Sequence, residues 1–205
     1  KDGRKKDFRQ RQPDGKGGWT WKTQGLKKFP YRLKEMTEAK GKPVFIVEGE
    51  KQVDYLREKH GLIATTNPGG AGKWLKPFAK YFRGIDVIVV PDADLPNEKT
   101  GKIVGAAHAK EAADSLLSEA QSVHLIELPN CQPKWGLDDW LEAGNTLDDL
   151  SKILESTKAW GPDSELITSV ALPGATPEEM ADPLLNDRRI LEECGITYVA
   201  QNEKT

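Results

Sequence analysis

Short apolar runs and amphipathic stretches alternate along the middle of the chain. The apolar runs are rich in β-branched residues and bounded by Gly, Pro and Asp, which predicts buried strands at residues 44–48, 62–66, 86–91 and 122–127. The amphipathic stretches predict helices near residues 50–59, 74–82, 102–119, 137–143 and 146–156. Gly61 can end the first helix, and Asn145-Thr146 can cap the last. This alternation predicts an α/β fold, in which a parallel sheet of about four strands is flanked by helices.

The segments on either side of this body have different patterns. Residues 7–23 predict a β-hairpin around a Pro13-Asp14-Gly15 turn, and residues 31–39 predict a short helix that leads into the sheet. Beyond residue 158, repeated Pro and Gly leave one predicted helix, at residues 177–194. We therefore divide the chain into a basic β-hairpin with its lead-in helix (1–41), an α/β domain (42–158) and a linker or C-terminal extension (159–205).

Composition narrows the class of protein without identifying it. With 37% hydrophobic and 30% charged residues among 205, the chain is typical of a soluble globular protein with one good core. No apolar stretch approaches the roughly 18 residues that cross a bilayer, so we expect no membrane partner.

The cysteines and the chain start bear on location. Cys131, Cys194 and three scattered histidines provide neither a zinc site nor a disulfide framework, which makes a reducing cytoplasm the expected location. The first residues lack an initiator Met and an apolar signal segment, and we expect a fragment of a longer protein.

Charge is distributed unevenly along the chain. Residues 1–40 carry 13 Lys+Arg against 5 Asp+Glu, whereas the remainder carries 17 against 27. A basic arm of this kind suits contacts with phosphate backbones, and a solvated basic surface is the alternative. Arg9 and Arg11 share one face of the predicted hairpin, and Trp19 and Trp21 share a face of its second strand. These side chains could grip phosphates and stack bases, or the two rings could cover the edge of the core.

Two of the predicted strands end in carboxylates. Glu48 follows the apolar run 44–47, and Asp92 and Asp94 follow the run 86–91. Parallel α/β sheets bind ligands beyond the carboxyl ends of their strands, so these acids lie where a site is expected. In an extended chain, Asp92 and Asp94 would point to the same face and could hold one Mg²⁺, or Mn²⁺, between them. The alternative is an Asx turn that merely ends the strand.

This pattern of strands and acids resembles a known domain. A strand followed by Glu48-Gly49 and a helix, and then, 44 residues after Glu48, a strand followed by Asp92-Ala93-Asp94, resembles the toprim domain of primases, topoisomerases and some nucleases. Segments outside these motifs are similar to the DNA primase and primase-helicase proteins of phages and mobile elements: residues 8–11, 13–19, 65–74 and 138–141. The resemblance covers roughly residues 42–128, and it implies that Glu48, Asp92 and Asp94 are the catalytic and metal-binding acids.

The resemblance also implies a reaction. Its members join ribonucleotides into RNA primers on single-stranded DNA, so nucleoside triphosphates, a DNA template and a helicase domain or subunit become the expected partners. Phosphoryl transfer requires Mg²⁺ to neutralise phosphate oxygens and a group that handles the proton. We assign metal binding to Asp92 and Asp94, and proton handling or further metal binding to Glu48. Gly49 would let the backbone turn tightly beside the substrate, and the helix after it would direct its N-terminus at a phosphate.

Other residues are weaker candidates for phosphate contacts. Gly72 and Lys73 end a Gly-rich loop that lacks the Walker spacing, so a phosphate cradle and a plain strand-to-helix turn both fit. Lys51 could reach a phosphate or stay solvated, and Glu50 suits a helix N-terminus by its charge alone. A surface role is an equal alternative for the remaining charged residues near the predicted site, which are Glu98, Lys134, Asp138 and Asp139.

Two further functions stay open. A toprim nuclease would use the same acids to cut nucleic acid, because microscopic reversibility gives both reactions one site. A non-catalytic nucleic-acid-binding module of a replicative helicase or initiator protein would need only the basic arm. A DNA primase-like nucleotidyltransferase is the leading hypothesis, because the acids and the basic hairpin occur together.

Overall fold

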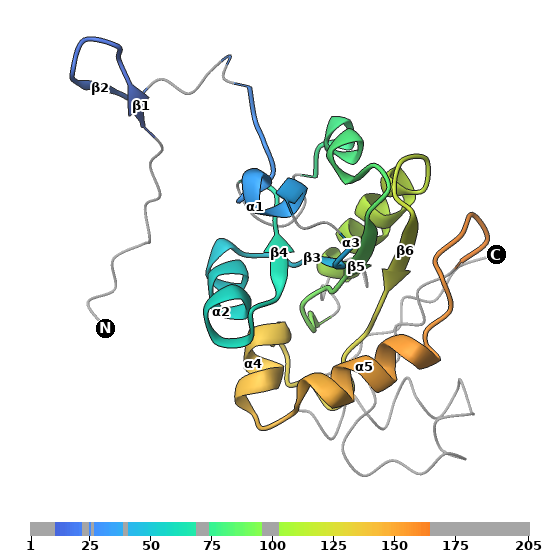
Figure 1. Cartoon of the computed structure of the whole chain (residues 1–205). Coiled ribbons are helices and arrows are strands. Elements are labelled where there is room, and N and C mark those ends of the chain that lie inside the picture. The colour runs from blue at the N-terminus through green and yellow to red at the C-terminus, as the bar shows by residue number, and fades with distance from the viewer. Residues whose placement is uncertain are drawn as a thin grey trace, which may run out of the picture.

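A four-stranded parallel sheet forms the centre of the molecule (Figure 1). The computed structural model describes residues 11–21, 25, 27–38, 41–68, 74–95 and 103–164. The sheet has the order β4-β3-β5-β6, and its strands are β3 (Val44–Ile46), β4 (Ile63–Thr65), β5 (Asp86–Val89) and β6 (Ser122–Leu125). Each strand falls within its predicted range, and the predicted α/β fold with a parallel sheet is confirmed.

Five α-helices accompany these strands in the described part of the chain. They are α1 (Leu33–Glu38), α2 (Glu50–His60), α3 (Val104–Leu116), α4 (Leu137–Glu142) and α5 (Leu147–Ser156). Of these, α2 and α3 connect one strand to the next. Gly61 ends α2 in the left-handed conformation, at φ 64°, and Thr146 caps α5 by accepting a hydrogen bond from the Asp149 amide. Both predicted helix boundaries are therefore confirmed.

One connection differs from its prediction. Residues 74–82 were expected to form an α-helix, but the structure has a 3-10 helix, η1 (Lys76–Phe82). Pro77 lies in its first turn and has no amide hydrogen to donate, and the amide of Phe78 bonds the carbonyl of Leu75 three residues earlier.

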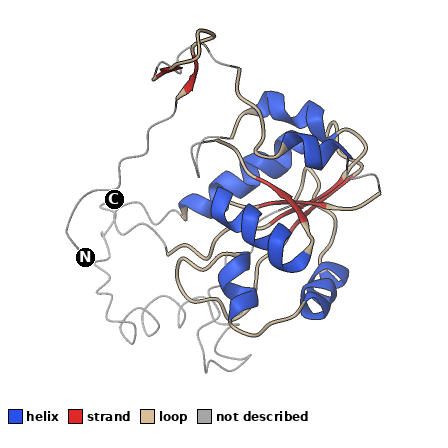
Figure 2. Cartoon of the chain, turned by 60° about the vertical axis from the view of Figure 1, so that its left-hand side comes forward, coloured by secondary structure: helices blue, strands red, loops and turns tan. Residues whose placement is uncertain are grey.

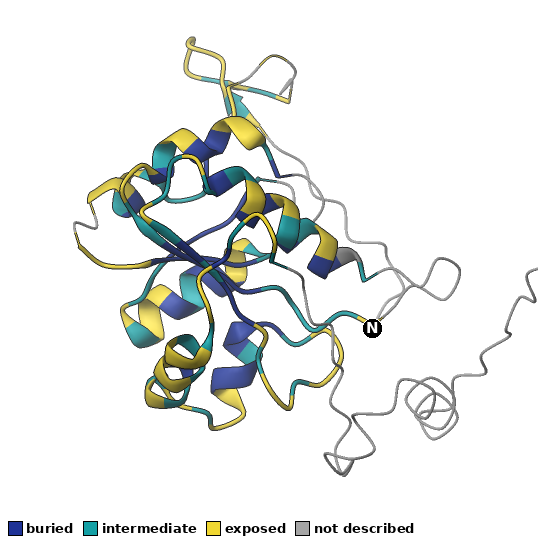
Figure 3. Cartoon of the chain, turned by 90° about the vertical axis from the view of Figure 1, so that its right-hand side faces the viewer, coloured by how far each residue is buried: buried dark blue, intermediate teal, exposed yellow. Residues whose placement is uncertain are grey.

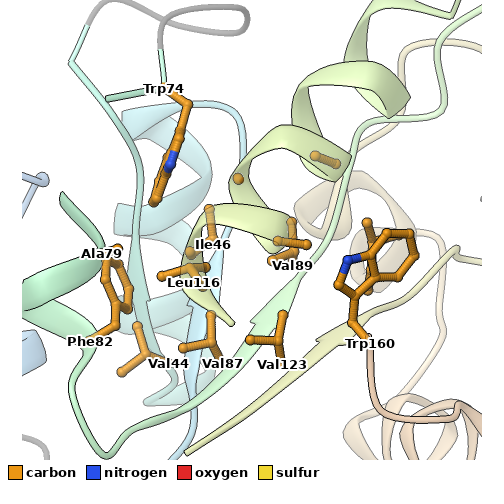
Figure 4. Close-up of a cluster of buried hydrophobic side chains, with 14 of the residues drawn as sticks. Val44, Ile46, Trp74, Ala79, Phe82, Val87, Val89, Leu116, Val123 and Trp160 are labelled. Atoms are coloured by element: carbon orange, nitrogen blue, oxygen red, sulfur yellow. The ribbon is translucent and has the colours of Figure 1, made fainter. Parts of the chain in front are cut away.

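Helices lie on both faces of the sheet (Figure 2). Alternate residues of each strand pack against opposite helical layers. Val44 and Ile46 face a cluster completed by side chains of α1, η1 and α3 together with Trp160 (Figure 4). Phe45 and Val47 face the other cluster, which contains side chains of α2, α4 and α5. Figure 3 shows the burial that results from this packing: the strands and the inner sides of the helices are buried, and the outer sides of the helices are exposed. Burial on both faces explains why the strands are apolar throughout rather than alternating with polar residues.

The register brings the ends of β3 and β5 together. β3 pairs in parallel with both β4 and β5, and Ile46 lies opposite Val89. The pairing extends beyond the strands, since the amide of Val90 donates to the carbonyl of Ile46 at 2.9 Å. Glu48 and Asp92 therefore leave the sheet at the same edge.

The predicted hairpin is present at the N-terminal side. β1 (Gln12–Pro13) pairs antiparallel with β2 (Trp19–Thr20), and Figure 1 shows this hairpin apart from the central sheet. Asp14 closes the turn, because its Oδ1 accepts hydrogen bonds from the amides of Lys16 and Gly18, each at 2.8 Å. One interpretation of the sequence was that the two tryptophan rings cover the edge of the core. The structure does not support it, since Trp19 is 54% and Trp21 61% exposed.

Several predictions fall outside the described residues. They concern Arg9, Gly72, Lys73, Glu98, the outer ends of the hairpin and the helix at residues 177–194. The domain boundaries at 41 and 158 stay predictions, although Trp160 packs into the core and its amide donates to the carbonyl of Val123. In the part of the chain that the structure describes, no helix is long and apolar enough to cross a membrane.

Candidate active site

Glu48 lies directly after β3, at the carboxyl edge of the sheet. Its backbone carbonyl accepts a hydrogen bond from the Thr66 hydroxyl at 3.0 Å, which ties the segment to the end of β4. Gly49 then precedes α2 with an extended backbone, at φ −128° and ψ 146°. The tight turn predicted for Gly49 is therefore wrong. Among the described residues other than its two chain neighbours, no atom lies within 4 Å of the place where its Cβ would be, so this side of Gly49 has room for a ligand.

Asp92 and Asp94 lie on a turn and not on an extended segment. The amide of Asp94 donates to the backbone carbonyl of Asp92 at 2.9 Å, which closes a three-residue turn. Ala93 is fixed from both sides, because its amide donates to Trp135 and its carbonyl accepts from the amide of Lys134. The condition of an extended chain, under which the two side chains would point to the same face, is therefore not met. The Asx turn is not formed either, since the Asp94 amide bonds a backbone carbonyl instead of the Asp92 carboxylate.

The carboxylate of Asp92 contacts α2 and the start of α4. Gln52, from α2, donates its side-chain Nε2 to Asp92 Oδ1 at 2.8 Å. Gly136 lies against this pair, and a Cβ there would contact the Gln52 amide and stand 2.8 Å from Asp92 Oδ1. A side chain at position 136 would therefore require the Gln52 amide or the Asp92 carboxylate to move aside.

The carboxylate of Asp94 meets that of Glu48 at the start of α3. The amide of Gly105 donates to Asp94 Oδ2 at 3.1 Å. A Cβ on Gly105 would lie 2.6 Å from Glu48 Oε1 and 2.9 Å from Asp94 Oδ2, so both oxygens lie against the same glycine. The fold thus brings two acids from different strands together at the N-terminus of a helix, where negative charge is favourable.

The negative charge at this edge is poorly compensated. Glu48 Oε1 is buried without a hydrogen-bond partner among the described residues. Burial, followed by the nearby charges of Asp92 and Asp94, raises the pKa of Glu48 to about 7. Burial also raises the pKa of Asp92 to about 6, against the opposing effect of the Gln52 hydrogen bond. In the described part of the chain, no Lys or Arg forms an ion pair with Glu48, Asp92 or Asp94.

A further acid lies beside Asp92. Asp138 lies in the first turn of α4 and is only 5% exposed. The surface role that was one alternative for this residue is therefore wrong. Its Oδ1 has no partner within the described ranges, and Lys51 Nζ lies 3.9 Å from its Oδ2. Burial, followed by the charge of Asp139, raises the pKa of Asp138. Lys51 thus lies between this acid and solvent, whereas Asp139 accepts a hydrogen bond from the Gly136 amide.

A cavity of about 130 Å³ adjoins Asp92 and Asp94. Its wall is mostly apolar and is formed by the end of β5, the start of α3 and the loop after β6. The residues that line it besides the two acids are Pro91, Ala93, Leu95, Ile103, Ala106, Glu127, Leu128, Pro129, Asn130, Cys131 and Pro133. Acids at one end and apolar walls beyond them suit a ligand that has a charged part and a flat apolar part.

The beginning of the Gly-rich loop is fixed near the same edge. Asn67 is buried after β4, and its Oδ1 lies 3.3 Å from His108 Nε2 of α3. After the loop, Trp74 is buried and donates its indole N–H to the hydroxyl of Ser115 at 2.7 Å. Both flanks of the loop are therefore attached to α3.

The acids fit a hard divalent cation by donor type. Carboxylate oxygens are the preferred protein ligands of Mg²⁺, which keeps several waters and needs only one or two carboxylates beside a substrate phosphate. The unpartnered Glu48 Oε1 next to Asp94 Oδ2 leaves such oxygens available. Within the described ranges, no group of three or more His, Cys, Asp or Glu side chains is placed so that it could hold a metal ion.

The sequence indicated the three acids but not the residues that hold them. Gln52, Gly105 and Gly136 contact the carboxylates, and none was a candidate. Gln52 offered one signal, since it stands next to Val53 in the buried stripe of α2, where a polar residue needs a partner. The two glycines gave no signal, because the contacts that require them come from distant parts of the chain.

Together, the fold and the site define an α/β protein with an acidic site at the carboxyl edge of a parallel sheet. Among solved structures, the chain is similar to the zinc-binding and RNA polymerase domains of the Aquifex aeolicus primase, with a TM-score of 0.45 and 18% sequence identity. The match covers 62% of this chain and 28% of that chain. At this level of similarity the likeness does not bear on activity. No family model and no curated protein matches the sequence.

Proposed function

We propose that this chain is a primase-type toprim core, which joins ribonucleotides on a single-stranded DNA template in a Mg²⁺-dependent reaction. The observation that carries this proposal is the buried, unpartnered oxygen of Glu48 beside the carboxylate of Asp94, with Asp92 on the same turn. Glu48 and Asp92 are costly to ionise without a cation, because burial disfavours their charged forms.

In this proposal the acids have separate roles. Asp92 and Asp94 would hold Mg²⁺, which when bound neutralises the phosphate oxygens of the nucleotide. Gln52 orients Asp92 and the Gly105 amide orients Asp94, so both carboxylates are fixed before the substrate arrives. Glu48 adjoins Asp94 and would accept the proton of the attacking hydroxyl or supply a further metal ligand.

The adjacent cavity supports a nucleoside triphosphate as the substrate. Its apolar walls, which include Ile103, Leu128 and Pro129, would pack against the base, while the triphosphate would stay beside Asp92 and Asp94. The open space at Gly49 leaves room for the phosphates next to Glu48.

The proposal is tested by primer synthesis with matched acid variants. Purified protein, single-stranded DNA, labelled nucleoside triphosphates and Mg²⁺ should yield short labelled oligomers. Asp92→Asn and Asp94→Asn keep the side-chain shape but remove the charge, and each should abolish the product. Asp163→Asn is the control, because Asp163 is exposed and lies outside the site.

The same assay separates the two alternatives. A nuclease would degrade the DNA in Mg²⁺ without added nucleotides, and Asp92→Asn would stop the loss. A non-catalytic module would give neither oligomers nor degradation. Oligomers from the Asp92→Asn and Asp94→Asn variants at the wild-type level would contradict the proposed site.

Metal binding has a readout that does not depend on activity. Titration with Mn²⁺, followed by electron paramagnetic resonance, should detect bound metal in the wild type and much less in Asp94→Asn. Equal binding by the two proteins would place the metal elsewhere.

A further inference from the structure

Aromatic side chains are exposed near the N-terminal side of the described chain. The large hydrophobic side chains that are exposed in the described part are Trp19, Trp21, Phe29 and Leu95. Three of these four are aromatic and fall between residues 19 and 29, with exposed fractions of 54%, 61% and 43%. Exposed aromatic rings this close together in the sequence suit contact with a partner, because each ring loses the stabilisation that burial would give.

Basic side chains lie over two of these aromatic rings. The guanidinium of Arg11 lies 4.2 Å from the centre of the Trp19 ring, and Lys27 Nζ lies 5.4 Å from that of Phe29. Phe29 also contacts Tyr81 of η1, with ring centres 6.2 Å apart, and Lys80 Nζ lies 5.1 Å from the Tyr81 ring. Pairs of one aromatic ring and one cation therefore occur both on the hairpin and beside η1 of the α/β body.

The hairpin holds its rings on a closed turn. Asp14 accepts two amide hydrogen bonds across the turn and donates its own amide to the carbonyl of Gly18 at 3.0 Å. Gly15 and Gly17 supply the positive φ angles that the turn requires. Because the turn is already formed, binding on Trp19 costs less conformational entropy than it would on a flexible arm.

We propose that Arg11, Trp19, Trp21, Lys27, Phe29 and Tyr81 form an aromatic–basic track that binds single-stranded nucleic acid without sequence preference. This inference rests on the proposed function, because the track would hold the single-stranded DNA template on which the primer is made. Bases of a single strand stack on exposed rings, and phosphates pair with the interleaved cations. The charge distribution favours this occupant, since residues 1–40 are strongly basic and the rest of the chain is acidic and repels phosphates.

The experiment measures binding of the full chain to labelled oligonucleotides without Mg²⁺ or nucleotides. Fluorescence anisotropy should give similar affinities for single strands of different sequence and much weaker binding to blunt duplex DNA. Replacing Trp19 and Trp21 together by Ala should weaken binding by about tenfold or more, and Phe29→Ala should weaken it by a smaller factor. Replacing both tryptophans by Phe keeps two stacking rings and should retain most of the affinity.

A charge control and a fold control complete the test. Lys27→Ala should weaken binding, whereas Lys158→Ala, an exposed lysine beyond α5, should not. Circular dichroism of each variant checks that the fold is kept. Unchanged affinity in the double Trp→Ala variant would overturn the proposal, as would equal affinity for duplex DNA.

Failure of the track and failure of the proposed function are distinguishable. The binding assay is repeated with Asp92→Asn, which should bind single strands as the wild type does. If single strands bind on the track but no oligomers form with Mg²⁺ and nucleotides, the track stands and primer synthesis fails. If oligomers form but the Trp→Ala pair leaves binding unchanged, the track fails and the catalytic proposal stands.

Discussion

At the scale of single residues, two glycines determine how the carboxylates are arranged. Gly105 touches both Glu48 and Asp94, and Gly136 touches Gln52 and Asp92. In both places the neighbouring atoms are ends of side chains, which can move aside. A methyl group there would therefore displace the carboxylates more than it would disturb the core.

This difference gives a prediction for Gly105→Ala. Its helix propensity improves by up to about 1 kcal/mol, which offsets part of the crowding and leaves the free energy of unfolding little changed. Because Glu48 and Asp94 must both shift, affinity for Mn²⁺ should fall by about tenfold or more. Gly49→Ala is the matched control, since it meets open space and should keep the Mn²⁺ affinity. Equal Mn²⁺ affinities for the two variants, measured by titration, would contradict this role of Gly105.

The raised pKa values predict how stability depends on pH in the absence of metal. The folded protein keeps a proton on Glu48 up to about pH 7, whereas the unfolded chain releases it near the ordinary value of 4.5. The contribution is therefore fully present below about pH 4.5 and is lost as the pH rises through about 7. For Asp92, whose pKa is also raised by burial, the corresponding window runs from 3.8 to about 6.

Glu48→Gln isolates this effect because it removes the charge and keeps the shape. Relative to wild type, the variant should gain stability between about pH 5 and about pH 8, by on the order of 1 kcal/mol once solvent screening is allowed for. Chemical denaturation with a chelator present measures the difference. A stability difference that does not change with pH would show that Glu48 is ionised throughout.

At the scale of elements, helix caps and connections carry stability separately from the site. Thr146 accepts a hydrogen bond from the amide of Asp149, and Asp149 Oδ2 accepts from the amide of Thr146 at 3.0 Å. Thr146→Ala should lower the free energy of unfolding by about 1 kcal/mol, and Thr146→Ser should restore most of it. Denaturation curves check both values. Loss of Mn²⁺ affinity in Thr146→Ala would contradict the separation of α5 from the site.

The elements were predictable where local sequence determines them. Runs such as Val44-Phe45-Ile46-Val47 are apolar and β-branched, so they suit only a strand that is buried on both faces. Gly61 and Thr146 end and begin helices through contacts with residues a few positions away. The 3-10 form of η1 was not predicted, although Pro77 was visible, because an apolar stretch alone does not distinguish the two helix types.

The site was predictable in its acids and not in its geometry. The turn at Asp92 to Asp94 depends on backbone bonds from Ala93 to Lys134 and Trp135, some forty residues later. The contact of Gly105 with Glu48 joins α3 to the end of β3. Such contacts arise only when the fold brings distant segments together, so spacing along the sequence gave no sign of the turn from Asp92 to Asp94.

At the scale of the whole molecule, opposite charges separate two surfaces. The aromatic–basic track lies on the basic arm and on η1, which ends before β5 begins. The acids instead follow the carboxyl ends of strands, Glu48 that of β3 and Asp92 and Asp94 that of β5. Single-strand binding should therefore weaken as salt rises, with a logarithmic slope of about −0.7 for each phosphate neutralised. Lys27→Ala should make the slope less negative by about 0.7. Affinities measured across a salt series check this, and a slope equal to that of the wild type would remove Lys27 from the track.

The separation of the two surfaces also predicts how they divide the reaction. Because the rings contact the template and not the reacting atoms, replacing Trp19 and Trp21 by Ala should raise the template concentration needed for half-maximal rate by about tenfold. Turnover at saturating template should stay near the wild-type value. Asp94→Asn should do the opposite, since it keeps template affinity and abolishes turnover at any template concentration. Steady-state rates over a template series measure both effects. If the Trp→Ala pair instead lowered turnover at saturating template, the track would have to act on the chemical step, and the two surfaces would not be independent.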